Sequence, residues 1–247
     1  MKRDGRPTRR VGAFIFDLDG TLVDSGADIA LSANHMRVTL GLPELPLPVV
    51  LRFVGDGASM LVRRLLAHPA HPGDAPPAVD DEAVRRAVAL FQIHYARHCL
   101  DATTLYPGVR ETLDRFAALP LAVATNKPAA FARTILAGLG IAGRFRRIVA
   151  ADDVPRRKPD PGHLTACLDG LAVAPVDVVV VGDSPNDILA ARGIGAVAVG
   201  ATYGLTSPAL VRAAAPDLLI DRFDRLAALF TPGHGGERGI VQRLRQL

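Results

Sequence analysis

Cysteine is scarce in this sequence of 247 residues. Its two cysteines, Cys99 and Cys167, are far apart and match no spacing of a metal or redox motif. The basic start of the chain is followed by an apolar run, 11–16, that is too short for a secretory signal. Isolated thiols without such a signal favour a reducing, cytoplasmic setting.

Long apolar runs and basic clusters are also missing. No stretch approaches the roughly 18 apolar residues that a membrane helix needs, so we expect no membrane partner. Aromatic residues make up only 5% of the chain and its arginines are scattered, a pattern that argues against a nucleic-acid partner. The modest formal charge of +4 also suits a small anionic substrate, so net charge alone decides little.

What the chain does contain is a series of short apolar runs separated by helical patterns. Such runs are typical of strands that are buried on both faces of a parallel sheet. The sequence therefore predicts a doubly wound α/β fold with a mainly parallel sheet. The predicted strands are 11–16, 121–125, 148–150, 176–182, 196–199 and 217–220, and the predicted helices are 107–118, 128–139, 161–171 and 185–194.

The first two of these strands are separated by about a hundred residues that contain no good strand, far more than a crossover requires. We interpret residues 24–103 as an inserted all-helical domain, with helical patterns near 25–41, 57–68 and 80–98. The α/β domain would then comprise 10–23 and 104–231. The tail, 232–247, is predicted to be flexible or to add a helix over 239–247.

Two acids follow the first strand directly. Asp17 and Asp19 are two residues apart, a spacing that in an extended chain sends both side chains to the same side. In open α/β sheets the carboxyl ends of the strands are where ligands bind. Taken alone, the pattern could also be a turn closed by Gly20.

A second pair of acids, Asp183 and Asp187, follows the strand 176–182. Carboxylates delivered by two strand ends make a suitable site for Mg²⁺, which prefers oxygen ligands. The alternative is that Asp183 and Ser184 only cap the helix behind them, with Pro185 in its first turn. Capping does not exclude metal binding.

Two further segments offer groups that bind phosphate. Thr125 and Asn126 stand between a strand and a helix, where a hydroxyl and backbone amides can hold an anion or simply cap the helix. Only three of the 29 basic residues are lysines, and two of them, Lys127 and Lys158, lie in such segments. A protein that otherwise uses arginine favours lysine where a compact charge is needed.

Taken in order, these segments resemble the four motifs of the haloacid dehalogenase-like phosphohydrolases, and the resemblance spans nearly the entire chain. The matching segments are Phe16 to Ser25, Thr125-Asn126, Lys158-Pro159 and Gly182 to Asp187. The insert 24–103 resembles the helical cap domain of that family.

The resemblance implies a phosphatase that forms an aspartyl-phosphate on Asp17, with Asp19 as general acid and base. It implies that Mg²⁺ is held by Asp17, the backbone carbonyl of Asp19 and Asp183, with Asp187 nearby. Thr125 and Lys158 would bind the transferring phosphoryl group. Because the acid at Asp19 has no use in halide displacement, the chain is expected to be a phosphatase and not a dehalogenase.

Finer features resemble the bacterial phosphoglycolate phosphatases, among them the run Phe53 to Ala58 and Thr202-Tyr203-Gly204. The implied substrate, 2-phosphoglycolate, carries a carboxylate. We expected Arg52 and the amides of the loop from Gly55 to Gly57 to bind that group, although a turn and a solvated arginine would look the same.

Other substrates stay open at this point: pyrophosphate, a nucleotide or a sugar phosphate. A phosphomutase, which shares the first half of the chemistry, also stays open. The expected partner is a small phosphate ester, and the expected assembly is a monomer or a homodimer.

Overall fold

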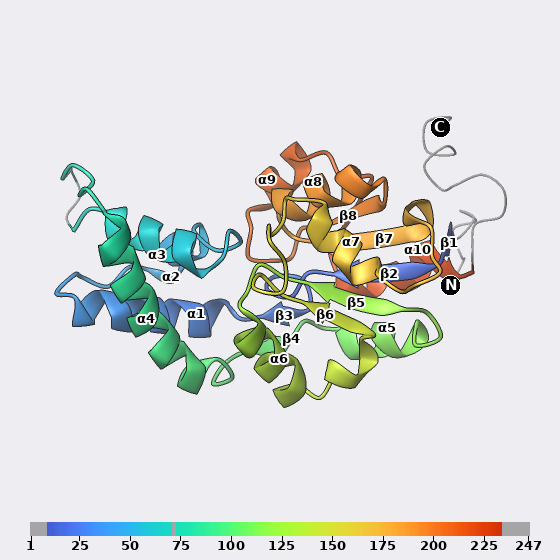
Figure 1. Cartoon of the computed structure of the whole chain (residues 1–247), viewed down its shortest axis with the longest axis horizontal. Coiled ribbons are helices and arrows are strands. Elements are labelled where there is room, and N and C mark those ends of the chain that lie inside the picture. Colours follow the sequence, from blue (N-terminus) through green and yellow to red (C-terminus); the bar gives the residue numbers. More distant parts are fainter. Residues whose placement is uncertain (1–8, 71–72, 234–247) are drawn as a thin grey trace.

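The computed structural model describes residues 9–70 and 73–233, and its centre is a six-stranded sheet (Figure 1). All neighbouring strands run parallel, in the order β6-β5-β2-β7-β8-β9. The strands are β2 (Ala13–Phe16), β5 (Leu121–Ala124), β6 (Arg147–Val149), β7 (Val178–Gly182), β8 (Val197–Ala201) and β9 (Leu218–Ile220). Each overlaps one predicted strand, so the predicted α/β class is confirmed.

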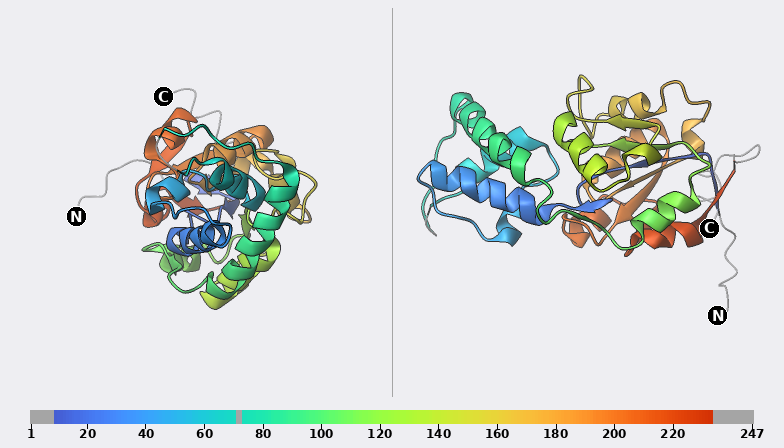
Figure 2. Two further views of the ribbon diagram at one scale, coloured as in Figure 1. Left: turned by 90° about the vertical axis from the view of Figure 1, so that its left-hand side faces the viewer. Right: turned by 90° about the horizontal axis from the view of Figure 1, so that it is seen from below.

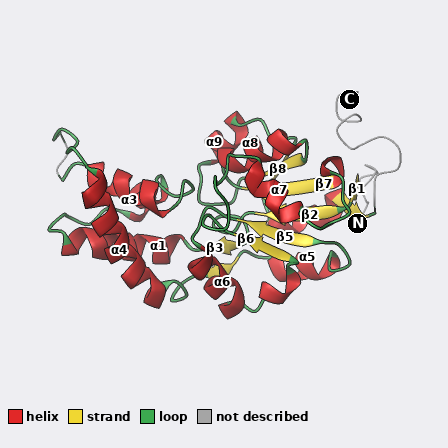
Figure 3. Cartoon of the chain, in the orientation of Figure 1, coloured by secondary structure: helices red, strands yellow, loops and turns green. Residues whose placement is uncertain are grey.

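Helices cover both faces of this sheet (Figure 3). Successive residues of β2 alternate between two apolar clusters: Phe14 and Phe16 belong to one, Ala13 and Ile15 to the other. The first cluster includes side chains of α5 (Val109–Arg115), α6 (Ala129–Gly138) and α10 (Leu226–Leu229), and the second those of α7 (Gly162–Leu168) and α8 (Pro185–Ile194). Burial on both faces explains why the strands are apolar throughout.

A separate group of helices lies at one end of the molecule, beside the sheet (Figures 1 and 2). It starts after β3 (Val23–Asp24) and ends before β4 (Thr104–Leu105), and these two short strands pair antiparallel. We call residues 25–103 the helical unit. Its helices are α1 (Gly26–Thr39), α2 (Leu47–Leu51), α3 (Ala58–Ala67) and α4 (Asp81–His98). Its core, which includes Met36, Leu65 and Phe91, is continuous with the first cluster of the sheet.

Several elements differ from the prediction. The strand predicted from Val176 starts at Val178 instead, because Pro175–Asp177 form a 3₁₀ turn (η2). The run predicted as one strand over 11–16 is two, since β1 (Arg9–Val11) leaves the main sheet and pairs with β10 (Phe230–Pro232). The remaining elements are η1 (Ala142–Arg144), α9 (Pro208–Ala213) and η3 (Phe223–Arg225).

Two further expectations concern the membrane and the tail. Within the ranges that the structure describes, no helix combines the length and the apolar character that crossing a membrane requires. Of the predicted tail, Pro232 belongs to β10, and residues 234–247 lie outside the described residues.

Candidate active site

Three neighbouring strands, β5, β2 and β7, deliver polar side chains to the same edge of the sheet. Thr125 follows β5, Asp17 follows β2 and Asp183 follows β7. The backbone N–H of Asp17 still donates to Val181 O (2.9 Å), which extends the ladder to the nucleophile position that the sequence suggests. The strands β5 and β6 lie on one side of β2, and the later strands β7, β8 and β9 lie on the other. The carboxyl end of β2 is therefore at a topological switch point, where ligands usually bind in open α/β sheets.

Lys158 enters this edge from the loop before α7 and is 3% exposed. Its ammonium group donates to Ala124 O (2.5 Å) and Asp187 Oδ1 (2.6 Å), and forms an ion pair with Asp17 Oδ1 at 2.8 Å. Burial opposes its charge, but Asp17 and Asp187 outweigh that effect and raise the pKa of Lys158 above its usual value. The lysine therefore stays charged beside Asp17.

His163 holds the backbone of Lys158, a role that no motif in the sequence indicates. The Lys158 N–H donates to His163 Nδ1 (3.2 Å), so Nε2 carries the proton and donates to Val149 O (3.1 Å). Burial, followed by the charge of Lys158, lowers the pKa of His163 to about 4. The imidazole is therefore neutral and fixes the lysine loop against β6.

Three acids form a cluster that fits a metal ion. One carboxylate oxygen each of Asp17, Asp183 and Asp187 lies within 4.8 Å of the other two. Burial, only partly offset by Lys158, raises the pKa of Asp17 to about 7, and burial together with Asp17 and Asp187 raises that of Asp183. Lys158 balances only part of the negative charge of these three carboxylates, and a divalent cation, which prefers oxygen ligands, would balance the rest.

The chain around Asp183 is packed tightly enough to fix this carboxylate. Its Oδ2 accepts hydrogen bonds from the backbone of Leu205 (2.8 Å) and Thr206 (3.0 Å). Gly20 has a φ of +83°, and a Cβ there would lie 2.2 Å from Asp183 Oδ2. The glycine after the two acids is thus required by the close approach of Asp183. Asp187 is held in a similar way by the hydroxyl of Ser184 (2.6 Å).

Asp19 faces away from the acidic cluster and toward Lys127. The ammonium group of Lys127 donates to both carboxylate oxygens of Asp19, at 2.9 and 3.0 Å, and Ser25 Oγ donates to Oδ1 at 2.5 Å. Lys127 is 8% exposed. The sequence assigned this lysine no role, and the only signal for it was the rarity of lysine.

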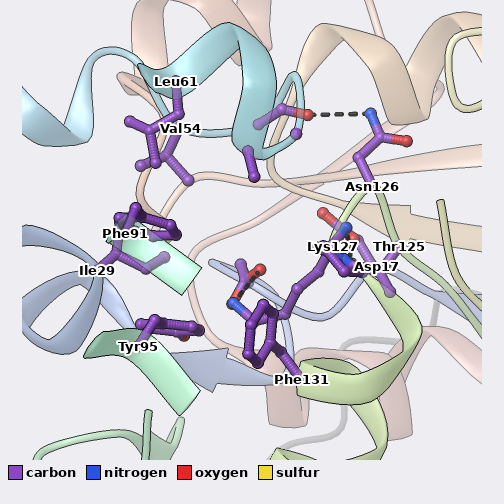
Figure 4. A pocket seen from close by; sticks show the side chains of 15 residues that line it. Asp17, Ile29, Val54, Leu61, Phe91, Tyr95, Thr125, Asn126, Lys127 and Phe131 are labelled. Atoms are coloured by element: carbon purple, nitrogen blue, oxygen red, sulfur yellow. Dashed lines mark hydrogen bonds and ion pairs between the residues drawn. The ribbon is translucent and has the colours of Figure 1, made fainter. Parts of the chain in front are cut away.

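A cavity of about 60 Å³ lies between this edge of the sheet and the helical unit (Figure 4). Gly55 and Gly57 line this cavity, whereas Arg52 is exposed and is not part of its wall. The lining residues are Asp17, Asp19, Ile29, Val54, Gly55, Gly57, Ala58, Leu61, Phe91, Tyr95, Thr125, Asn126, Lys127, Pro128 and Phe131.

Asn126 connects the two halves of the cavity. Its amide group donates to Lys158 O and to Gly55 O, both at 3.0 Å (the second bond is drawn in Figure 4). Thr125 is oriented differently: its hydroxyl accepts from the Lys127 N–H at 3.1 Å. The segment 125–127 therefore contacts the lysine loop, the helical unit and Asp19 at once.

Comparison with known proteins agrees with this geometry. The family model described as haloacid dehalogenase-like hydrolase matches residues 14–201. A phosphoglycolate phosphatase of Pseudomonas putida is 40% identical over 209 residues, which cover 84% of this chain and 75% of the relative. A phosphoglycolate phosphatase of Chromobacterium violaceum is 37% identical over 227 residues, 91% of this chain and 99% of the relative.

The fold is shared with solved structures as well. A crystal structure of a predicted phosphoglycolate phosphatase from Haemophilus somnus 129pt superposes with a TM-score of 0.81 and 32% identity, covering 88% of this chain and 97% of the other. Because the family model spans most of the chain and these relatives are similar over most of their length, this protein belongs to the haloacid dehalogenase-like hydrolases.

Proposed function

We propose that this hydrolase cleaves 2-phosphoglycolate to glycolate and phosphate through an aspartyl-phosphate on Asp17. The observation that supports it best is the meeting of Asp17, Asp19 and Lys158 with the acidic cluster beside one small cavity. The names of the two relatives above support the choice of substrate.

In the first step the carboxylate of Asp17 attacks phosphorus and the bond from phosphorus to the glycolate oxygen breaks. The proton of Asp19 goes to that leaving oxygen. In the second step Asp19 takes a proton from water, whose oxygen attacks the phosphorus of the aspartyl-phosphate. Phosphate leaves and the Asp17 carboxylate is restored. The ion pair with Lys158 orients Asp17 for the attack and favours its ionised form against the effect of burial.

The proposed roles of the other residues follow from their places. Thr125 follows the strand next to Asp17, where its hydroxyl and the backbone amides after it can donate to phosphoryl oxygens. The Lys158 ammonium group lies between Asp17 and Asp187, so it can reach a phosphoryl group held at Asp17. Both donors are fixed before the substrate arrives.

We also propose Mg²⁺ as the cation of the acidic cluster, held by Asp17, Asp183 and the backbone carbonyl of Asp19, with Asp187 in support. When bound, Mg²⁺ neutralises the acids and the phosphate oxygens and so lowers the barrier for attack by an anion. The side chain of Asp19 stays free of this cluster for proton transfer, since it faces Lys127.

The test is phosphate release with Mg²⁺ from 2-phosphoglycolate, sugar phosphates, nucleotides and pyrophosphate, with Asp17→Asn as control. We expect kcat/KM for 2-phosphoglycolate to exceed all others by at least about tenfold, equivalent to about 1.4 kcal/mol. A flat profile that Asp17→Asn abolishes would reject the substrate and keep the mechanism. Isomer formation without phosphate release would indicate a mutase, and release that survives Asp17→Asn would reject the nucleophile.

A further inference from the structure

The part of the cavity wall that the helical unit forms is mostly apolar. Ile29, Val54, Leu61 and Phe91 line it from that side, and Phe131 lines it from α6. A leaving group with a negative charge would be desolvated against these side chains at a high cost in free energy. A site of this kind binds an anion only if a fixed cation or hydrogen-bond donor is present.

Lys127 provides such a cation on the side of the leaving group. Lys158 and its partners Asp17 and Asp187 occupy the side of the phosphoryl group, whereas Lys127 contacts Asp19, the proposed donor of the leaving-group proton. The Lys127 ammonium donates to both carboxylate oxygens of Asp19, and the residue is buried within the cavity wall. An ammonium held in this way supplies a fixed positive charge beside the leaving group.

Tyr95, from α4, completes this part of the wall. Its ring lies under the Lys127 ammonium, with 4.7 Å from Nζ to the ring centroid, and the residue is 1% exposed. Its hydroxyl is buried and has no hydrogen-bond partner among the residues that the structure describes. A buried polar group without a partner is unusual in a folded protein, and one that lines a cavity is available to a ligand or an ordered water.

We infer that Lys127 and the Tyr95 hydroxyl together form the subsite for the carboxylate of the substrate. This inference rests on the proposed function and names the residues that select its substrate class, a phosphate ester with an anionic leaving group. A carboxylate two carbons from phosphorus then lies beside Asp19, where the leaving oxygen needs its proton. The subsite replaces the expected role of Arg52, which is exposed and outside the cavity.

The experiment compares 2-phosphoglycolate with ethyl phosphate, which has the same two carbons and no carboxylate. For Lys127→Gln we expect kcat/KM to fall about 100-fold more on 2-phosphoglycolate than on ethyl phosphate. For Tyr95→Phe, which removes one oxygen, the extra loss is expected to be about tenfold and to lie mainly in KM. Arg52→Gln tests the alternative, in which Arg52 binds the carboxylate.

Equal losses on both esters would show that Lys127 acts only through Asp19 and would overturn the subsite. A selective loss in Arg52→Gln, with none in Tyr95→Phe, would also overturn it. Wild-type enzyme that prefers a different carboxylated phosphate would reject the proposed function but keep the subsite, provided that Lys127→Gln abolishes this preference.

A binding measurement covers the case in which turnover by the Lys127 variant is too slow to measure. In an Asp17→Asn background, calorimetric titration with 2-phosphoglycolate should show a Kd about tenfold higher when Tyr95→Phe is added. An unchanged Kd would overturn the role of the hydroxyl. Thermal unfolding of each variant reports whether it is folded, and we expect Tyr95→Phe to be folded because no partner of the hydroxyl is lost.

Discussion

At the scale of the residue, the backbone of Gly20 approaches the carboxylate of Asp183 so closely that no side chain fits between them. We expect Gly20→Ala to lower both stability and activity, since the new methyl group would collide with a carboxylate of the acidic cluster. Gly41 is the matched control, because its φ of +75° is similar but nothing lies within 4 Å of the added Cβ.

Gly41→Ala should therefore cost only the backbone strain, about 1–2 kcal/mol, and leave activity unchanged. Gly20→Ala should cost more than this in urea denaturation and should also lower the affinity for Mg²⁺. Equal costs for the two variants, with metal affinity intact, would show that the contact with Asp183 relaxes freely.

Because the pKa of His163 is lowered, we expect the free energy of unfolding to fall in acid. Its pKa is about 4 in the folded protein and about 6.5 when unfolded, so the unfolded chain binds the proton first as the pH falls. Stability from this group is complete above pH 6.5 and declines toward pH 4, by about 3 kcal/mol in total.

Urea denaturation between pH 7 and pH 4.5 should show this decline in the wild type and a flatter profile in His163→Gln. Glutamine can still accept from the Lys158 N–H, but it does not titrate. Identical pH slopes for the two proteins would contradict the assignment.

At the scale of the element, hydrogen bonds join the helical unit to the loop after β5 and to the first turn of α8. Asn186 Nδ2 donates to Asp56 Oδ1 at 2.7 Å, and Asp56 also pairs with Arg64 at 2.5 Å. Burial opposes the ionisation of Asp56, but its bonds with Asn186 and Arg64 lower its pKa below the usual value. The carboxylate is thus held charged at the junction of the two units.

We expect Asn186→Ala to raise KM about fivefold, with a smaller effect on kcat, because one bond that holds the helical unit over the cavity is lost. Asp56→Ala should have a similar effect. Steady-state kinetics of both single variants and the double variant measure the coupling. Fully additive effects would show that the bond does not act between these two residues.

The elements that could be predicted from sequence are those with enough residues to show a pattern. The buried strands appear as runs because both of their faces are covered, and the long helices α1, α3 and α4 overlap predicted ones. The pairs β1–β10 and β3–β4 have two or three residues per strand, too few for any periodicity. Likewise α2, with five residues, lies among prolines.

In the site, the residues that could be predicted are those that follow a predicted strand, and those that could not are brought together by contacts between distant segments. Asp17, Thr125 and Asp183 follow predicted strands, so their meeting at one edge follows from the parallel order of the sheet. The contact of Lys127 with Tyr95 joins α4 to the loop after β5, and no spacing in the sequence indicates it. The prediction for Arg52 rests on its charge and on its place before the loop from Gly55 to Gly57, and neither fixes the direction of its side chain.

At the scale of the whole molecule, charge balance leads to a prediction about metal removal. Without a cation, the folded state favours the protonated form of Asp17, whose pKa rises from 3.8 to about 7. Because this folded pKa is the higher one, the contribution of Asp17 to stability is present below pH 3.8 and is lost as the pH rises toward 7.

Mg²⁺ should therefore raise the melting temperature more at pH 8 than at pH 5, and EDTA should abolish phosphate release at both. Differential scanning calorimetry with and without the cation measures the first effect. Asp183→Asn, which removes one charge of the cluster, should reduce the shift at pH 8. A shift that is the same at both pH values, or none in the wild type, would contradict the proposed metal site.

The antiparallel pair β3–β4 brings the start and the end of the helical unit side by side, with Asp24 opposite Thr104. The helical unit is an insertion in the α/β chain. If it were removed, a short turn could join the end of β3 to the start of β4. Recombination or engineering could exchange this branch for another without changing the register of β2 between β5 and β7. On the proposed function, such an exchange would keep Asp17 and Lys158 in place and replace Tyr95, so it would change the choice of substrate and keep the chemistry.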